Sequence, residues 1–204
     1  MTVKDHWENV YTTKSYDEVS WFQSHSIKSL ELINSLGLPL SASLIDVGGG
    51  ASILVDDLIK LGYSKLQVLD LSLAALKTSQ ERLGDISKQI NWIEADITDE
   101  RLKALKVDLW HDRAVFHFLT DKINRQKYIN NLTHILNKNG HVIIATFAED
   151  GPEKCSGLDI CRYNPHSLAL ALGECFTLVS HHKETHQTPF NTKQNFIYCH
   201  FIKN

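Results

Sequence analysis

The 204-residue sequence predicts an α/β domain with a mostly parallel sheet. Short apolar runs typical of buried strands alternate with segments whose apolar residues have helical spacing. Three consecutive glycines join the first such run to the helix that follows it. The last two apolar runs follow one another with no helix between them, which indicates an antiparallel hairpin. We expect one domain over residues 1–204, because the sequence shows no repeat, low-complexity tract or linker.

Composition and charge exclude several classes of protein. Hydrophobic residues make up 43% of the chain and charged residues 22%, which is ordinary for a globular domain. The net charge is −3 with no basic stripe, so we expect no nucleic-acid partner. No apolar run approaches a membrane span and the first residues do not resemble a signal peptide, so we expect no membrane contact and a cytoplasmic protein. The four cysteines lack C-x-x-C spacing and the histidines lack a ligand pattern, so we expect free thiols and no metal site.

The first forty residues are rich in aromatic side chains and precede every predicted strand. Residues 6–11 can form one or two helical turns, and residues 27–36 have one apolar helical face. Two interpretations remain open, and they are compatible. Residues 1–40 pack on the edge of the domain, or they form a lid that covers a ligand held by residues 41–204 and excludes water. The aromatic residues are Trp7, Tyr11, Tyr16, Trp21 and Phe22.

A strand-to-helix turn follows, with a predicted strand at 44–47, glycines at 48–50 and a helix over 53–61. Glycine permits positive φ angles and lets a ligand approach the backbone closely, so the turn is a candidate nucleotide site. The dinucleotide fingerprint needs a third glycine where Ile53 stands, and a phosphate loop needs a Lys-Ser/Thr pair that is absent. A tight turn with no ligand is the alternative.

The second predicted strand, residues 66–70, ends at Asp70, which lies 22 residues after Gly48. An acidic residue at this distance can accept hydrogen bonds from the ribose hydroxyls of an adenosine, with Leu71 beside it in the site. The alternative for an isolated aspartate at a strand end is the N-cap of the next helix, which we expect over 73–83.

The pattern Asp46-x-Gly48-x-Gly50 resembles motif I of the class I S-adenosylmethionine-dependent methyltransferases, although Ser52 replaces the third glycine of that motif. The resemblance implies a Rossmann-like seven-stranded sheet of order 3-2-1-4-5-7-6 with the last strand antiparallel. It also implies that S-adenosyl-L-methionine is the cofactor and that Asp46, Gly48, Gly49 and Gly50 contact it.

A third predicted strand ends near Glu94, and Asp96 and Ile97 follow it. In the methyltransferases, an acidic and then an apolar residue at this place bind the adenine, so the resemblance assigns that role to Asp96 and Ile97. Carboxylates would then lie at three successive strand ends, at Asp46, Asp70 and Asp96. Three carboxylates would repel a phosphate but suit a cationic sulfonium beside an ammonium group.

The fourth predicted strand, residues 107–110, is followed by the polar residues His111, Asp112, Arg113 and His117. Chemistry in an open parallel sheet occurs at the carboxyl ends of the strands, so these four residues are the catalytic candidates. Residues 112–119 (DRAVFHFL) resemble the segment that follows this strand in small-molecule methyltransferases of the thiopurine and tellurite-resistance types. His111 is also a candidate cofactor contact, and His111 or Asp112 is the candidate base. The alternative interpretations are that His117 is a core residue and that Arg113 forms an ion pair with a nearby carboxylate.

The rest of the chain completes the predicted sheet. We expect a helix over 123–136 capped by Asn139-Gly140, a strand over 141–147, an acceptor-binding loop, and a hairpin of strands 175–186 and 195–202.

Methyl transfer from S-adenosylmethionine to a small-molecule nucleophile is the predicted function, with a thiol or a metalloid as candidate acceptors. Alternatives are methylation of a protein lysine and a cofactor-binding module without catalysis; a nicotinamide oxidoreductase is disfavoured by Ile53. Trp21 is expected to close over the methionine end of the cofactor, where its ring can favour the sulfonium.

Overall fold

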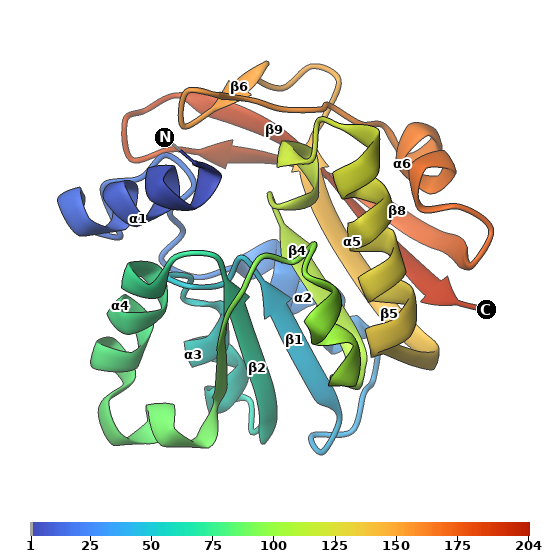
Figure 1. The fold of residues 1–204 in the computed structure, drawn as a ribbon, viewed down its shortest axis with the longest axis horizontal. Helices are drawn as coiled ribbons and strands as arrows, with labels where there is room; N and C mark the ends of the chain where they lie inside the picture. The colour runs from blue at the N-terminus through green and yellow to red at the C-terminus, as the bar shows by residue number, and fades with distance from the viewer. Residues whose placement is uncertain (1) are drawn as a thin grey trace.

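Seven strands form the main sheet of the computed structural model, which describes residues 2–204 (Figure 1). Their order is β3-β2-β1-β4-β5-β9-β8; β1 to β5 are parallel, and β9 is antiparallel to both β5 and β8. This confirms the predicted order and the antiparallel last strand. The strands are β1 (Ser43–Val47), β2 (Lys65–Asp70), β3 (Asn91–Glu94), β4 (Val107–Arg113), β5 (Leu136–Phe147), β8 (Phe176–Gln187) and β9 (Lys193–Lys203), and a separate two-stranded hairpin comprises β6 (Lys154–Cys155) and β7 (Leu158–Asp159).

Helices cover both faces of this sheet. Side chains of α2, α3 and α4 pack against one face, and those of α5, α6 and η2 pack against the other. The helices are α1 (Val3–Thr13), α2 (Ile27–Ser35), α3 (Leu54–Lys60), α4 (Leu73–Leu83), α5 (Lys122–Ile135) and α6 (Pro165–Leu172), with the short 3₁₀ helices η1 (Gly84–Gln89), η2 (Glu100–Ala104) and η3 (Phe116–Phe118). No helix within residues 2–204 is long and apolar enough to cross a membrane.

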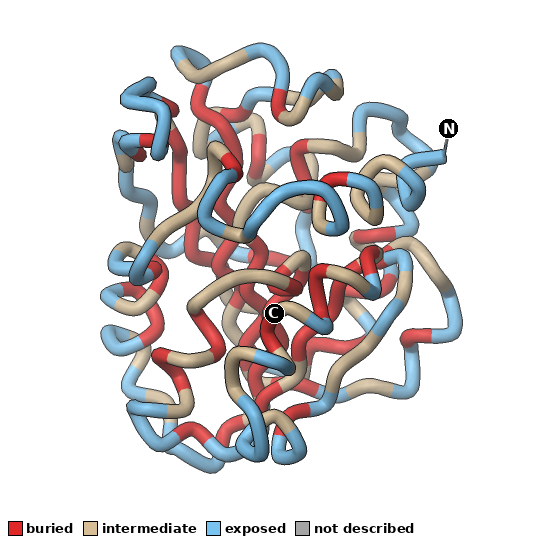
Figure 2. The backbone as a smooth tube through the Cα atoms, turned by 90° about the vertical axis from the view of Figure 1, so that its left-hand side faces the viewer, coloured by how far each residue is buried: buried red, intermediate tan, exposed pale blue. Residues whose placement is uncertain are grey.

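Strand β5 shows why strands in the middle of the sheet carry apolar residues on both faces. Successive side chains of a strand point to opposite faces, so Val142 and Ile144 join the core beneath α5 while Ile143 and Ala145 join the core beneath α2 and α3. The strands therefore run as buried stretches through the centre of the molecule, and the exposed residues lie on the surrounding helices and loops (Figure 2).

The N-terminal segment crosses the carboxyl end of the sheet. Helix α1 lies beyond the ends of β1 and β2, close to α4 (Figure 1). Its Glu8 carboxylate accepts hydrogen bonds from the Ser72 hydroxyl (2.7 Å) and the Ala74 N–H (3.2 Å), so it caps the N-terminus of α4. Farther along the segment, the carbonyl of Ser20 lies 2.9 Å from Nε2 of His186 on β8. The segment is thus fastened to both halves of the sheet.

Two boundaries differ from the prediction. Strand β4 continues to Arg113, because its backbone pairs with β5 as far as Ala145. The Asn139-Gly140 pair does not cap a helix: α5 ends at Ile135, and Leu136 already pairs with β4. Asn139, with φ 60°, lies instead in an irregular stretch where the β4–β5 register shifts.

A buried polar cluster joins β4 to α5. The Tyr128 hydroxyl donates to Asp112 Oδ2 (2.6 Å) and accepts from the indole N–H of Trp110 (2.8 Å). All three side chains are fully buried. Because no water reaches them, each polar atom depends on the others for its hydrogen bonds.

We therefore predict that Tyr128→Phe lowers the free energy of unfolding by ~1–3 kcal/mol, since it leaves the Trp110 N–H and an Asp112 oxygen buried without that partner. Urea denaturation followed by circular dichroism measures the change. A loss below ~0.5 kcal/mol, the range of neutral surface substitutions, would show that the cluster contributes little.

Candidate active site

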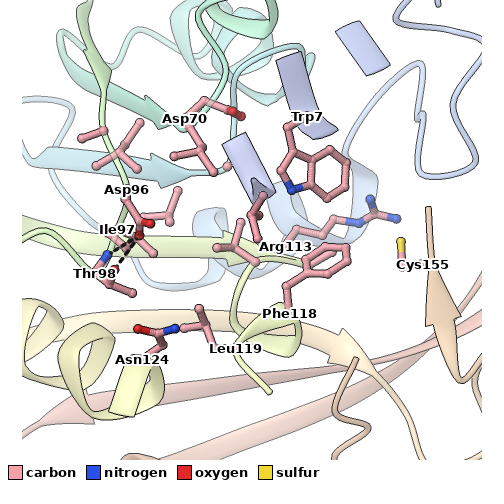
Figure 3. A pocket seen from close by; sticks show the side chains of 18 of the residues that line it. Trp7, Asp70, Asp96, Ile97, Thr98, Arg113, Phe118, Leu119, Asn124 and Cys155 are labelled. Atoms are coloured by element: carbon pink, nitrogen blue, oxygen red, sulfur yellow. Dashed lines mark hydrogen bonds between the residues drawn. The ribbon is translucent and has the colours of Figure 1, made fainter. Parts of the chain in front are cut away.

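A cavity opens at the carboxyl ends of β1, β2, β3 and β4, beneath the N-terminal segment (Figure 3). We call it the main cavity. A smaller side cavity adjoins it and shares Tyr11, Trp21, Val47, Gly48 and Arg113 with it. Of the residues predicted to bind the cofactor or catalyse the reaction, the main cavity is lined by Trp21, Gly48, Asp70, Leu71, Asp96, Ile97 and Arg113. The side cavity adds Asp46, Gly49 and His111.

The three glycines are required by the protein's own carboxylates and by Val115. A Cβ at Gly49 would lie 2.2 Å from Asp46 Oδ2, and a Cβ at Gly50 would lie 2.6 Å from Asp70 Oδ2. Gly48 has φ +72°, and its Cβ would lie 2.2 Å from a methyl of Val115. We expected glycine here to admit a ligand, but the structure uses it first to pack the turn onto these side chains. Gly50 lines neither cavity.

Asp46 lies under the turn in a chain of hydrogen bonds. Its Oδ1 is 2.7 Å from Nδ1 of His111, whose Nε2 is 2.8 Å from the Ser29 hydroxyl of α2. All three residues are buried. The second carboxylate oxygen of Asp46 is buried without a partner. A buried carboxylate oxygen next to a cavity is a site for a cationic group, such as an ammonium.

Asp70 holds the glycine turn to the start of α4. It accepts hydrogen bonds from the backbone N–H of Gly50 (3.0 Å) and of Ser72 (2.8 Å). Burial raises the pKa of the Asp70 carboxyl to about 6, although the backbone N–H donors favour the ionised carboxylate and oppose this rise. Because each carboxylate oxygen can accept more than one hydrogen bond, Asp70 can still accept from a ribose hydroxyl in the main cavity.

Asp96 and Ile97 line the other end of the main cavity. Asp96 Oδ1 accepts from both the N–H (2.8 Å) and the hydroxyl (2.7 Å) of Thr98, which fixes the carboxylate, while Ile97 is buried (Figure 3). This end of the main cavity therefore presents a carboxylate next to an apolar side chain.

Two of the four catalytic candidates lie in the core instead of at a cavity. Because β4 extends to Arg113, Asp112 is inside the strand and bonds to Tyr128 and to the Val115 N–H (2.8 Å). His117 is fully buried in η3, and burial together with the charge of Arg113 lowers the pKa of its imidazole to about 3. The core interpretation of His117 therefore agrees with its position, and neither residue lines the main or the side cavity.

Arg113 is the catalytic candidate that reaches the main cavity. Its side chain extends between Trp7 and Phe118 toward Cys155 (Figure 3). It is not in the ion pair that we considered as an alternative: Nε donates to the Tyr198 hydroxyl (3.0 Å) and Nη1 to the Trp21 carbonyl (3.1 Å).

Aromatic side chains of the N-terminal segment form one wall of the main cavity. Trp7 packs edge-on against both Trp21 and Phe118, and the Trp21 indole N–H donates to the Tyr11 hydroxyl (3.1 Å). Trp7, Tyr11 and Trp21 thus face the main cavity, while Glu8 and Ser20 hold the N-terminal segment against the domain.

The main cavity is also lined by residues that were not predicted individually: Phe118 in η3, Asn124 in α5 and Cys155 in β6. Phe118 belongs to the stretch after the fourth predicted strand and Cys155 to the predicted acceptor-binding loop, whereas Asn124 belongs to no predicted motif. Within residues 2–204, no group of three or more His, Cys, Asp and Glu side chains is placed to bind a metal ion.

Comparison with known proteins gives the following relatives. Residues 45–142 match a family model described as a methyltransferase domain. The chain is 30% identical over 135 residues to malonyl-[acyl-carrier protein] O-methyltransferase 1 of Ilyobacter polytropus, covering 66% of this chain and 48% of that protein. It is 24% identical over 161 residues to EEF1A lysine methyltransferase 2 of Mus musculus, covering 70% and 64%. The chain thus spans about half to two thirds of these relatives.

The fold matches solved structures over nearly its whole length. A SAM-dependent methyltransferase from Anabaena variabilis superposes with a TM-score of 0.79 at 14% identity, over 100% of this chain and 96% of that one. This similarity extends to the N-terminal segment and the C-terminal hairpin, which the family model does not cover.

Asp70 makes the stability of the domain depend on pH. Its folded-state pKa of about 6 exceeds the ordinary value of 3.8, so the folded state binds more protons than the unfolded state between these values. The contribution of Asp70 to the stability of the folded state is therefore present at pH 4 and is lost as the pH rises through 6. Lowering the pH from 8 to 4.5 should stabilise the wild type relative to Asp70→Asn by about 2 kcal/mol. Urea denaturation at both pH values tests this, and Asp112 titrates equally in both proteins. A pH-independent difference would contradict the raised pKa.

Proposed function

We propose that this chain, whose residues 45–142 match a methyltransferase domain, is an enzyme of the class I S-adenosylmethionine-dependent methyltransferase superfamily that transfers the methyl group of S-adenosylmethionine to a small-molecule nucleophile. The observation that carries the proposal is the set of carboxylates at three strand ends: Asp46 at the side cavity, and Asp70 and Asp96 at the main cavity. Their total charge favours a cationic ligand and opposes a phosphate-bearing one.

The cofactor fits the residues that line the two cavities. Asp70 would accept from the ribose hydroxyls, and Asp96 with Ile97 would bind the adenine in the main cavity. The unpartnered oxygen of Asp46 would accept from the ammonium group of the methionine portion in the side cavity. When bound, S-adenosylmethionine supplies an electrophilic methyl group on a positively charged sulfur.

The protein's contribution to the reaction is placement and exclusion of water. The aromatic wall of Trp7, Tyr11 and Trp21 covers the cavity, and Glu8 and Ser20 hold this wall against the domain. An acceptor confined beneath it meets the methyl group with little loss of entropy at the transition state.

The identity of the acceptor has two broad candidates. The names of the relatives point to different acceptors, an oxygen of malonyl-[acyl-carrier protein] in one and a lysine of EEF1A in the other. The cavity lies under the N-terminal segment rather than in an open groove, which favours a small molecule over a folded protein. A module that binds the cofactor without catalysis is the remaining alternative, and detection of labelled-methyl transfer distinguishes it.

Cofactor binding is tested with a matched pair of aspartates. Asp96→Ala should weaken S-adenosylhomocysteine binding by ~1.5–3 kcal/mol, the range for a hydrogen bond to a charged group. Asp99→Ala is the control, because Asp99 is three residues away, pairs with Arg101 and does not line the main or side cavity. Isothermal titration calorimetry measures both variants. No binding to the wild type, or equal affinities for the two variants, would contradict the proposed site.

The lid role of Trp21 is tested with a matched pair of tryptophans. In a Trp7→Phe background, Trp21→Phe should remove most of the fluorescence change on adding S-adenosylhomocysteine, since Trp7 lines the main cavity and Trp21 lines both cavities. Trp92→Phe in the same background should leave that change intact, because the Trp92 indole bonds to the Ser87 carbonyl and Trp92 lines neither cavity. Trp21→Ala should also lower affinity. Lower thermal stability with unchanged affinity would instead assign Trp21 to packing alone.

A further inference from the structure

Within residues 2–204, no carboxylate lies within 4.0 Å of the Arg113 guanidinium, so Arg113 forms no salt bridge. Both of its hydrogen bonds go to neutral oxygens, those of Tyr198 and Trp21, and its Nη2 is buried without a partner. Glu184 accepts a hydrogen bond from Gln23 through Oε1 (3.4 Å), and its Oε2 is buried without a hydrogen-bond partner, as Nη2 of Arg113 is. A partly buried guanidinium with an unpartnered N–H group and no salt bridge is costly, and its presence at a ligand cavity indicates that an anion completes it.

The surroundings of the guanidinium are apolar. It lies over the Phe196 ring at 4.5 Å, and it shares the main cavity with Trp7, Phe118 and Cys155 (Figure 3). In this low-dielectric position a charge-assisted hydrogen bond to an anion is stronger than at the surface. The anion must therefore come with an apolar body that fits between aromatic rings.

The site offers no free general base beside Arg113. Both ring nitrogens of His111 have partners, Asp46 and Ser29, while Asp112 and His117 lie in the core away from the cavities. An acceptor that is protonated at neutral pH would have no group to take its proton.

Burial at this site separates the acceptor classes by their ionisation. Of the groups that line the main cavity, burial raises the pKa of the Cys155 thiol to about 12 and that of the Asp70 carboxyl to about 6. By the same cause, a thiol acceptor here would stay protonated at neutral pH, whereas a carboxyl acceptor would stay largely ionised. A lysine ammonium would in addition be repelled by Arg113.

We propose that the acceptor is a carboxylic acid with an apolar body, and that Arg113 binds its carboxylate and positions it for methylation; this rests on the proposed methyltransferase function. One carboxylate oxygen forms a bond to the methyl carbon while the carbon–sulfur bond breaks, and its electron pair stays on sulfur. The carboxylate and the sulfonium become a methyl ester and a thioether, both neutral at those atoms, and no proton is transferred. The reaction therefore needs no base.

The test compares acceptors of matched shape on the full-length protein. Phenylacetate and hexanoate are the acid probes, phenylmethanethiol and hexanethiol the thiols, and benzylamine and hexylamine the amines. Methyl transfer from labelled S-adenosylmethionine is followed by mass spectrometry, and binding to the S-adenosylhomocysteine complex by calorimetry. We expect the acids to bind and yield methyl esters, and the thiols and amines to do neither.

Arg113→Gln should raise the KM for the acid about 30-fold or more, as expected when one partner of a buried charge pair is removed. Arg113→Lys should restore part of that loss, because it keeps the charge but not the planar geometry. Arg101→Gln, which removes a cation paired with Asp99 outside the cavities, is the control. Circular dichroism checks that each variant is folded.

Three outcomes would overturn the inference. The first is preferential methylation of the thiols or amines. The second is a wild type that binds S-adenosylhomocysteine but neither binds nor methylates the acids. The third is an Arg113→Gln variant that loses S-adenosylhomocysteine affinity rather than acid affinity, which would place the guanidinium on the cofactor. Absence of S-adenosylhomocysteine binding to the wild type would instead refute the proposed function itself.

Discussion

Two buried carboxylates beneath a side-chain-free turn set the geometry of the whole site. Asp46 and Asp70 end neighbouring parallel strands, and Gly49 and Gly50 pack directly onto them. Asp70 then bonds to both the turn and the start of α4, while Asp46 bonds to His111 on the next strand. The turn, a helix N-terminus and strand β4 are therefore fixed relative to one another by the same acids that face the cavities.

The N-terminal segment depends on this frame and closes it. Ser72, which stands two residues after Asp70, is bonded by Glu8 of α1, so the position of the N-terminal segment follows from the position of α4. Ser29 of α2 bonds to His111, which links the same segment to β1 through Asp46. A displacement of the N-terminal segment would break hydrogen bonds at the strand ends, and the aromatic wall is thereby coupled to the carboxylates it covers.

Local patterns predicted the strands and selected most of the residues at the strand ends that line the two cavities, while the resemblance to the methyltransferases supplied the sheet order, which the structure confirms. Apolar periodicity locates the strands, and the spacing from Gly48 to Asp70 reflects one strand–helix–strand unit. The catalytic side was harder to predict. The predicted strand ended at Trp110, but β4 continues three residues farther, to Arg113, because of its pairing with β5, and this extension places Asp112 inside the strand. Phe118 lies in η3 and Cys155 in β6, and no local sequence pattern predicts that such distant segments line one cavity.

The negative and positive side chains around the two cavities lie at the ends of different strands. This separation indicates the type of reaction more strongly than any single residue does. Acids gather at the ends of β1, β2 and beyond β3, whereas the one guanidinium of the main cavity stands at the end of β4 among aromatic rings. A cationic methyl donor would bind near the acids, and an anionic acceptor would bind near Arg113. Their charges would neutralise one another as the methyl group moves. Because charge is lost in that step, an apolar, water-excluding site lowers its barrier, since the separated ions lose more solvation than the neutral products. The aromatic lid and the unpaired arginine are thus consistent with one reaction type, in which burial favours the transition state over the separated charges.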